Sequence, residues 1–374
     1  MYKWLWVLIS VPLVLAGPSA VSPDAVTLLA EEASHTVSGK MPGKVWMAGA
    51  SALASDAEGA DARPAQASDK PLLTFSVLSD IHVGAKDTVS QRKLSAALAD
   101  LHDVNPEADA LVINGDLTNG TPADYSKLRS LLKQAALPEK VRFTIGNHEF
   151  YKAWLDDKGA YSKTGFPHNE TDSASISRFL QFTGEKRVYN ADTIGEHRFI
   201  FLGSEQYRQS DPDNEEDAYL SADQLAWLKK ELSQASSSRK AASKPIFVFL
   251  HQPLPYTVAG SQYYVNTRAV IQHKELKTIL SAYPQVILFT AHTHWELKLP
   301  HTLVRDRFTM VNSSSVGEPL TDLGPEGEKP VSADASEGLY VEVYRDRVEI
   351  KGRDFYHRQW IPEAQFAVPI GSKH

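Results

Sequence analysis

Five short hydrophobic runs in this chain are each followed, within a few residues, by side chains that can bind a metal ion. The runs are TFSVL, ALVIN, VRFTI, IFVFL and VILFT, and their length and residue types predict β-strands. The side chains that follow them are Asp80, His82, Asp116, Asn147, His251, His292 and His294. Because open α/β sheets collect ligands beyond the carboxyl ends of their strands, we expect these side chains to form one cluster in an α/β fold.

The residue types in this cluster predict a metal centre with two ions. Asp, Asn and His are ligands that borderline divalent metals accept, and seven of them are too many for one catalytic ion. They suit two ions that share one carboxylate. Asp80 and His82 are two residues apart, so a continuing strand would point both to the same side, and the same holds for His292 and His294. A dinuclear centre of this kind is typical of phosphoester hydrolysis.

The order of the motifs resembles the calcineurin-like metallophosphoesterase superfamily, whose pattern is D-x-H, G-D, G-N-H-[DE], a lone His and G-H-x-H. This chain supplies Asp80-Ile81-His82, Gly115-Asp116, Gly146-Asn147-His148-Glu149, His251 and Ala291-His292-Thr293-His294, over roughly residues 72 to 315. Ala291 departs from the pattern, because the family usually has Gly there. If this position needs a positive φ, alanine costs about 1 kcal/mol or more.

The resemblance implies a metallophosphoesterase-type α-β-β-α four-layer sandwich with two mixed sheets. It implies that the first ion is held by Asp80, His82, Asp116 and His294, and that the second is held by Asp116, Asn147, His251 and His292. Asp116 then bridges two divalent ions of manganese, iron or zinc, which activate a hydroxide for attack on phosphorus. His148 lies outside the ligand set and acts near the leaving-group oxygen. Glu149 is expected to orient His148 or a ligand.

The residues after the G-D motif narrow the substrate class. Protein serine/threonine phosphatases carry an Arg shortly after this motif, and purple acid phosphatases carry a Tyr ligand there. This chain has neither, because its sequence is Gly115-Asp116-Leu117-Thr118-Asn119-Gly120. Asn119 falls near a position where related enzymes contact the phosphate. We therefore expect a phosphodiesterase; the alternatives are a broad phosphomonoesterase and a metal-bound scaffold that lacks catalysis. The tyrosines 256, 263 and 264 are candidates for the wall of the substrate pocket.

Composition limits the partners. The formal net charge is −7 and no block of Lys or Arg occurs, so long nucleic acid is not an expected partner. The expected partner is a small phosphoester substrate, and the sequence leaves the oligomeric state open. The chain has no cysteine, so disulfides and Cys–Zn sites are excluded.

The N-terminus resembles a secretory signal. Lys3 precedes an apolar run from Trp4 to Ala16, and small residues follow it. The run is shorter than the roughly 20 residues that span a bilayer, so no stable membrane anchor is expected. We predict a signal peptide over residues 1–20, a disordered Ala/Ser-rich spacer over 21–70, and one metallophosphoesterase domain over 71–365. The expected location is outside a bacterial cell.

Helices and further strands are predicted between and after the motifs. QRKLSAALADLHDV and ADYSKLRSLLKQAAL have apolar residues at helical spacing, and a capping box from Ser221 to Gln224 precedes LAWLKKELSQA. A helix is also expected around residues 271–280. RVYNADTIGEHRFIFLGSE predicts two strands around a turn at Gly195, and the tail after residue 305 is expected to be rich in strands.

Overall fold

The computed structural model describes residues 70–370 with the exception of 239–240, 242, 262–268 and 325–326. By internal contacts the chain divides into Met1–Gln66 and Ala67–His374, and the fold below belongs to the second of these units. The predicted signal peptide and all but the last residue of the predicted spacer lie outside the described residues. None of the helices in the described part is long and apolar enough to cross a membrane.

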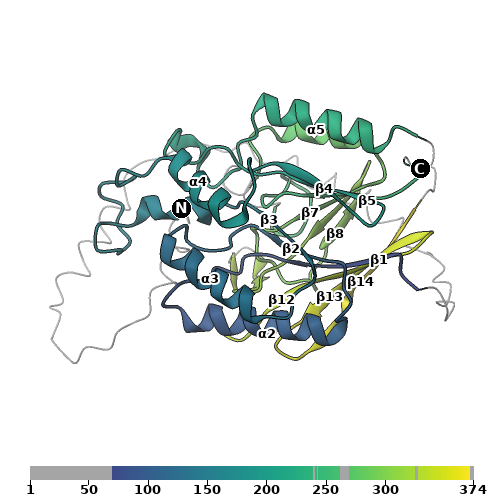
Figure 1. Ribbon diagram of the computed structural model, residues 1–374, viewed down its shortest axis with the longest axis horizontal. Helices are drawn as coiled ribbons and strands as arrows, with labels where there is room; N and C mark the ends of the chain where they lie inside the picture. Colours follow the sequence, from purple (N-terminus) through teal and green to yellow (C-terminus); the bar gives the residue numbers. More distant parts are fainter. Residues whose placement is uncertain (1–69, 239–240, 242, 262–268, 325–326, 371–374) are drawn as a thin grey trace, which may run out of the picture. The chain divides into compact units, whose positions relative to one another are not determined.

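Two sheets of six strands each form the centre of the fold (Figure 1). The first sheet has the order β14-β13-β12-β1-β2-β3 and contains β1 (Leu73–Leu78), β2 (Ala110–Asn114), β3 (Lys140–Thr144), β12 (Glu337–Val343), β13 (Arg347–Asp354) and β14 (Gln359–Pro369). The second sheet has the order β4-β5-β6-β7-β9-β8 and contains β4 (Asn190–Ile194), β5 (His197–Phe201), β6 (Ile246–Phe249), β7 (Val286–Thr290), β8 (Leu303–Arg305) and β9 (Thr309–Asn312). A small separate hairpin pairs β10 (Leu320–Asp322) with β11 (Glu328–Pro330).

Both sheets are mixed. In the first sheet β1 pairs in parallel with β2 and antiparallel with β12, and in the second β5, β6 and β7 run in parallel while β4 and β8 are antiparallel to their neighbours. Each of the five strands predicted to precede a ligand is present. The strands β1, β2, β6 and β7 are buried along their whole length, which explains their nearly continuous apolar sequences.

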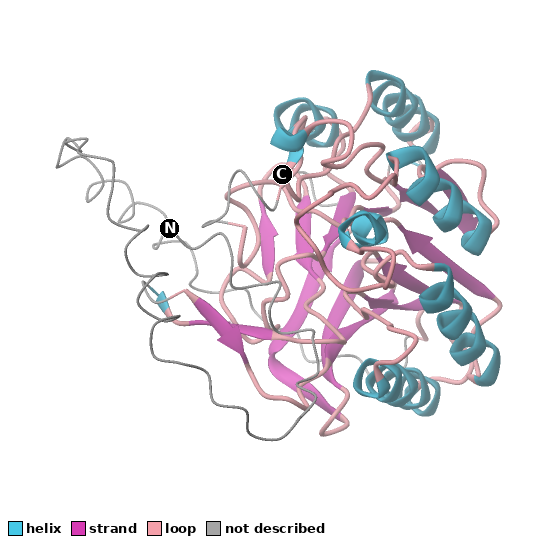
Figure 2. Ribbon diagram, turned by 90° about the vertical axis from the view of Figure 1, so that its left-hand side faces the viewer, coloured by secondary structure: helices cyan, strands magenta, loops and turns pink. Residues whose placement is uncertain are grey.

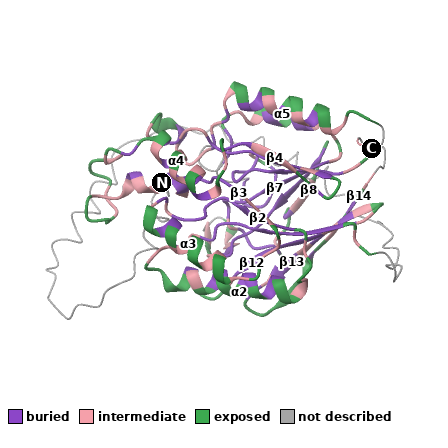
Figure 3. Ribbon diagram, viewed as in Figure 1, coloured by how far each residue is buried: buried purple, intermediate pink, exposed green. Residues whose placement is uncertain are grey.

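Helices cover the outer face of each sheet (Figure 1), and Figure 3 shows that they carry exposed residues on one side and buried residues on the other. The helices against the first sheet are α2 (Thr88–Val104), α3 (Pro122–Gln134) and α4 (Asp172–Thr183), and those against the second are α5 (Ala222–Ala235) and α7 (His273–Ser281). Short 3₁₀ segments lie at η1 (His148–Trp154) and η2 (Pro212–Asn214). Figure 2 shows the strands between helical layers. The predicted α-β-β-α sandwich is confirmed.

Three apolar clusters fill the three interfaces between these four layers. The central cluster joins the two sheets, and Phe75 of β1 meets Phe199 and Phe247 of the second sheet edge to face, with ring centroids 5.0 and 4.9 Å apart. The other two clusters lie between each sheet and its helices. The central cluster fixes how the two sheets face each other, and therefore where their carboxyl-terminal loops meet.

Two details of the predicted elements differ in the structure. Ser221 caps α5 by accepting the N–H of Gln224 at 3.2 Å, but the Gln224 side chain bonds Gly203 instead of closing the capping box. The N–H of Ser221 donates to Glu205 at 2.8 Å, so a carboxylate remote in sequence replaces the expected partner. The last strand, β14, runs to Pro369 and pairs with β13 on both sides of a register shift between Lys351 and Arg353, so it extends past the predicted domain end at residue 365.

Candidate metal centre

The loops that leave both sheets at the carboxyl ends of their strands bring the predicted ligands together. Asp80 and His82 follow β1, Asp116 follows β2, Asn147 follows β3, His251 follows β6, and His292 and His294 follow β7. The first three of these loops belong to one sheet and the last two to the other. The site therefore lies across the junction of the two sheets.

Two groups of potential ligand atoms share one carboxylate. One group is Asp80, His82, Asp116 and His294, the other is Asp116, His251 and His292, and within each group the ligand atoms lie within 4.8 Å of one another. The family resemblance implied the same sharing of Asp116, and it also assigned Asn147 to the second group. Asn147 is 3 % exposed, and its Oδ1 has no hydrogen-bond partner among the described residues. A buried amide oxygen without a donor is suited to a cation.

The imidazole rings present their Nε2 atoms to the cluster. His251 Nδ1 donates to the carbonyl of Asn114 at 2.8 Å, and His294 Nδ1 donates to the carbonyl of Glu318 at 2.9 Å. With the proton held at Nδ1, each neutral ring offers the lone pair of Nε2. The Nε2 atom of His251 lies 3.2 Å from Asp116 Oδ2, and that of His294 lies 3.0 Å from Asp80 Oδ1. The Nε2 atoms of His82 and His294 approach to 3.2 Å, a distance that suits a shared cation or proton.

Five of the ligand residues have left-handed backbone conformations. The φ angles are 50° for Asp80, 43° for His82, 51° for Asp116, 68° for His292 and 61° for His294. The explanation by strand alternation was wrong, because β1 ends at Leu78 and β7 at Thr290, before these residues. A residue in the left-handed conformation bends the backbone sharply. This conformation costs roughly 1–2 kcal/mol for a residue other than glycine. Such strain is concentrated at functional sites.

Ala291, the departure from the family pattern, carries no such cost. It is not among the residues with positive φ, and its N–H donates to the carbonyl of His251 at 2.8 Å. The left-handed turn begins one residue later, at His292. Alanine is therefore compatible with the backbone at this position.

The two motif glycines are required by close approach. A Cβ atom on Gly115, whose φ is 84°, would lie 2.4 Å from His251 Nδ1. A Cβ atom on Gly146 would lie 2.2 Å from Asp116 Oδ1. Both distances are far below a normal contact, so any larger residue would displace a ligand.

Glu149 holds two ligand loops together. Its buried carboxylate accepts the N–H groups of four residues: Asp116 at 3.1 Å, Leu117 at 2.9 Å, Thr118 at 3.1 Å and Gly146 at 2.7 Å. Burial and the charge of Asp116 raise the pKa of Glu149 to about 8, and the N–H groups of Gly146 and Thr118 oppose this rise. Glu149 therefore orients the backbone around Asp116, because its four hydrogen bonds go to backbone N–H groups rather than to the His148 ring.

His148 lies at the edge of the cluster, with its side chain 24 % exposed. Its N–H donates to Asp116 Oδ1 at 2.9 Å, and its Nε2 is 3.9 Å from Asp116 Oδ2. Its Nδ1 lies 2.9 Å from Asn119 Oδ1, and its ring stacks on Tyr151 with centroids 3.7 Å apart. Burial lowers the pKa of His148 to about 4, although the charge of Asp116 acts in the opposite direction.

The charged groups of the cluster shift one another's pKa values. Burial favours the neutral form of Asp116, but His251 and His148 outweigh it and hold the pKa of this carboxyl well below its ordinary value. Burial likewise disfavours charged His251, yet Asp116 and Asp80 raise its pKa to about 10. Binding of a cation at His251 must then displace a proton.

Three contacts were not predicted from the sequence. Asn119 binds His148, and Glu216 and Tyr151 contact the Asn147 amide, with Nδ2 donating to Glu216 Oε2 at 2.8 Å and to the Tyr151 hydroxyl at 3.5 Å. Asn119 could be found from its place in the G-D motif, although we expected it near the phosphate. Glu216 lies in an acidic stretch without a motif, so the sequence held no signal for it. Of the candidate pocket tyrosines, Tyr256 is exposed and the other two lie outside the described residues.

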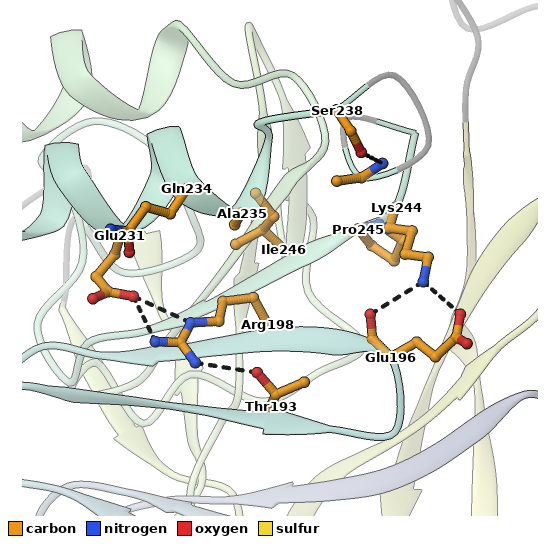
Figure 4. A pocket seen from close by; sticks show the side chains of 11 residues that line it. Thr193, Glu196, Arg198, Glu231, Gln234, Ala235, Ser238, Lys244, Pro245 and Ile246 are labelled. Atoms are coloured by element: carbon orange, nitrogen blue, oxygen red, sulfur yellow. Dashed lines mark hydrogen bonds and ion pairs between the residues drawn. The ribbon is translucent and has the colours of Figure 1, made fainter.

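A separate surface groove lies at the amino-terminal ends of β5 and β6, away from the carboxyl ends that carry the ligands (Figure 4). Its charged side chains are paired with one another, Arg198 with Glu231 and Lys244 with Glu196. This groove presents no group prepared for chemistry, and it does not compete with the metal centre as the functional site.

Comparison with known proteins agrees with this geometry. Calcineurin-like phosphoesterases as a family match residues 73–296, which is more than half of the chain and includes both ligand groups. The chain belongs to the calcineurin-like phosphoesterase family. This calcineurin-like phosphoesterase is accordingly a metal-dependent phosphoester hydrolase with residues for a dimetal site, for which divalent manganese, iron or zinc is typical.

Solved structures share the fold of this phosphoesterase at low sequence identity. A dimetal phosphatase from Danio rerio superposes with a TM-score of 0.57 and 14 % identity, covering 80 % of this chain and 99 % of that chain. The purple acid phosphatase PPD1 from yellow lupin (Lupinus luteus) seeds superposes with a TM-score of 0.54 and 14 % identity, covering 80 % of this chain and 55 % of that one. No curated protein matches the chain by sequence.

Proposed function

We propose that this protein is a phosphodiesterase that hydrolyses small phosphodiesters at a centre with two metal ions. The observation that supports this most directly is the pair of ligand groups joined at Asp116, with His148 beside the shared carboxylate. A purely structural metal site needs neither an accessible face nor a proton donor at its edge.

The residues have separate tasks in this proposal. Asp80, His82, Asp116 and His294 would hold the first ion, and Asp116, His251 and His292 would hold the second together with the buried Oδ1 of Asn147. The ions supply Lewis acidity and an activated water at neutral pH. His148 Nε2 lies 3.9 Å from Asp116 Oδ2, and with its ring protonated at both nitrogens it would donate a hydrogen bond or a proton to the leaving-group oxygen. Asn119 holds the other ring nitrogen and so fixes the direction of Nε2.

The charges around the site favour a diester over a monoester. A diester carries one negative charge, whereas a monoester near neutral pH carries up to two and gains from additional cations. Arg208, which is connected to the site through Glu216, is paired with that carboxylate at 3.1 Å. Lys152 of η1 and Arg178 of α4 are both paired with Glu170. These side chains are therefore not available as extra positive charge for a phosphate.

A broad phosphomonoesterase is the second candidate. The two solved structures of similar fold are described as phosphatases, and this keeps the monoester reaction open for the present chain. A scaffold without catalysis is a weaker alternative, because it would not require His148 and its Asn119 partner.

Hydrolysis of bis-p-nitrophenyl phosphate and of p-nitrophenyl phosphate would test the proposal. The purified protein is depleted of metal and then loaded with manganese, iron or zinc, or left without metal. Faster metal-dependent cleavage of the diester supports the phosphodiesterase. Faster cleavage of the monoester supports the phosphatase, and a folded protein that binds two ions but cleaves neither substrate would favour the scaffold.

We also propose that the protein is exported from a bacterial cell, on the basis of the apolar run from Trp4 to Ala16 after Lys3. Expression in an export-competent bacterium, followed by sequencing of the N-terminus of the protein outside the cytoplasm, tests this. Cleavage near Ala16 to Ala20 is expected. An intact Met1 on a protein that stays in the cytoplasm would contradict it.

A further inference from the structure

The carboxylate of Glu216 collects donors from four side chains beside the metal centre. Its Oε2 accepts from Asn147 Nδ2 at 2.8 Å and from the Tyr151 hydroxyl at 3.1 Å. The Tyr207 hydroxyl lies 2.9 and 3.0 Å from its two oxygens, and Arg208 Nη2 donates to Oε1 at 3.1 Å. Asn147 is 69 residues away in sequence, so the contact is created by the fold.

The contact with Asn147 decides which end of its amide faces the metal centre. A side-chain amide has a donor end and an acceptor end, and only the oxygen can bind a cation. Because Nδ2 is occupied by Glu216, the atom left for the cluster is Oδ1, which is buried and has no hydrogen-bond partner in the described part of the chain. A carboxylate suits this purpose because it only accepts hydrogen bonds and so cannot bond to the oxygen end of the amide.

The contact with Tyr151 extends the same control to His148. The Tyr151 ring stacks on the His148 ring with an interplanar angle of 23° and centroids 3.7 Å apart. Its hydroxyl is fixed by Glu216, while Asn119 fixes the Nδ1 edge of the same imidazole. The Glu216 carboxylate thus bonds both to Asn147, the candidate ligand of the second ion, and to Tyr151, which packs against His148.

Arg208 explains how this carboxylate is retained in a half-buried position. The Glu216 side chain is 21 % exposed and the Arg208 side chain 25 % exposed, so both are partly removed from water. A carboxylate in such surroundings is stabilised by a cation and by hydroxyl donors, and Glu216 has both.

We propose that Glu216 is a positioning residue that turns the Asn147 oxygen toward the second metal ion and holds Tyr151 against His148. This inference rests on the proposed function, because it assumes that Asn147 is a ligand. It assigns Glu216 no contact with substrate. Its expected effect is on the affinity of one ion of the two, and on turnover.

The first variant is Glu216→Gln. Glutamine has one acceptor oxygen, and the permanently charged Arg208 competes for it, so the new NH₂ group is left facing the Asn147 NH₂ group. The Asn147 amide is then expected to flip and present its nitrogen to the ion. We expect 10–100-fold weaker binding of the second ion and unchanged binding of the first. Calorimetric titration of the metal-depleted protein with Zn²⁺ or Mn²⁺ measures both steps.

Glu205→Gln is a matched control. Glu205 also holds its neighbours through a partly buried carboxylate, which accepts from the N–H of Ser221 and from Gln224 Nε2, both at 2.8 Å, and neither bond involves Asn147. The control variant is expected to lose some thermal stability and to bind both ions as the natural protein does. Equal weakening of the second ion in both variants would overturn the proposal, because the effect would then be general destabilisation.

Exchanging the amide of residue 147 and the carboxylate of residue 216 should restore binding of the second ion, which a merely structural role of Glu216 would not predict. In the Asn147→Asp/Glu216→Gln variant the glutamine amide can donate to the new carboxylate, and the other carboxylate oxygen remains for the ion. We expect the affinity for the second ion to recover at least tenfold over Glu216→Gln. No recovery, or no loss in Glu216→Gln, would overturn the proposal. If the natural protein itself binds fewer than two ions, the proposed function fails instead.

Discussion

Substitution of alanine for Gly115 should separate the close approach to His251 from the general cost of a left-handed residue. Gly115 has φ of 84° and Gly184, at the end of α4, has φ of 80°. An alanine in this conformation costs roughly 1–2 kcal/mol at either position. A Cβ atom at Gly184 would have no neighbour within 4 Å, so Gly184→Ala carries this cost alone and is the matched control.

At Gly115 the new Cβ atom would lie 2.4, 2.5 and 2.7 Å from Nδ1, Cγ and Cβ of the fully buried His251. Carbon contacts are normally about 3.5–4.0 Å, so the imidazole must move by about 1 Å. That movement would break the bond from His251 Nδ1 to the Asn114 carbonyl. Overpacking and the lost hydrogen bond raise the expected cost of Gly115→Ala to about 3–6 kcal/mol.

Urea unfolding of the metal-depleted variants measures these free energies without a contribution from bound ions. Metal analysis after reloading gives a second measurement. Ligand distances tolerate only about 0.2 Å, so Gly115→Ala is expected to lose the ion held by His251 while Gly184→Ala retains both ions. Equal losses of unfolding free energy, with both variants binding two ions, would show that the Gly115 contact does not control the position of His251.

The remaining predictions concern the shared carboxylate, the proton-transfer residue and a buried ion pair. Asp116→Asn should weaken both ions and abolish turnover, and normal activity with two bound ions would refute the bridging role. His148→Ala should retain both ions and lower kcat by roughly 10²–10⁴; loss of an ion would make His148 a ligand instead. Asp100→Ala leaves the buried Arg353 guanidinium, which donates to Asp100 at 2.7 and 2.9 Å, without its buried partner. It should lower the unfolding free energy by about 3–5 kcal/mol in urea without changing metal content.

The candidate metal ligands could be predicted because four of the five motifs follow a strand that is buried along its length, whereas β3, before Asn147, is only partly buried. β1, β2, β6 and β7 are buried on both faces, so their sequences show where each strand ends. The ends of the strands then place the ligands. This logic depends on local sequence and on one general property of α/β sheets, and it needs no knowledge of how the two sheets pack.

The contacts between loops could not be predicted in the same way. The bond from Asn147 to Glu216 and the bond from Ser221 to Glu205 join residues whose separation in sequence carries no pattern. The left-handed conformations of Asp80 and His82 were also missed, because strand alternation gave the same grouping of side chains for a different reason. The sequence therefore predicted which side chains lie together, although the backbone conformation that we assumed for them was wrong.

The position of the centre across two sheets means that neither half of the chain can assemble it alone. His292 donates its N–H to Asp80 Oδ2 at 3.3 Å across a separation of 212 residues. Closing a loop of that length in a flexible chain costs about 5 kcal/mol of free energy, because the chain loses conformational entropy. Folding of the sandwich closes this loop before an ion binds. Ion uptake therefore reports that both sheets are in place. A nascent or truncated chain that stops before β7 would have the Asp80 side of the centre and no means of completing it.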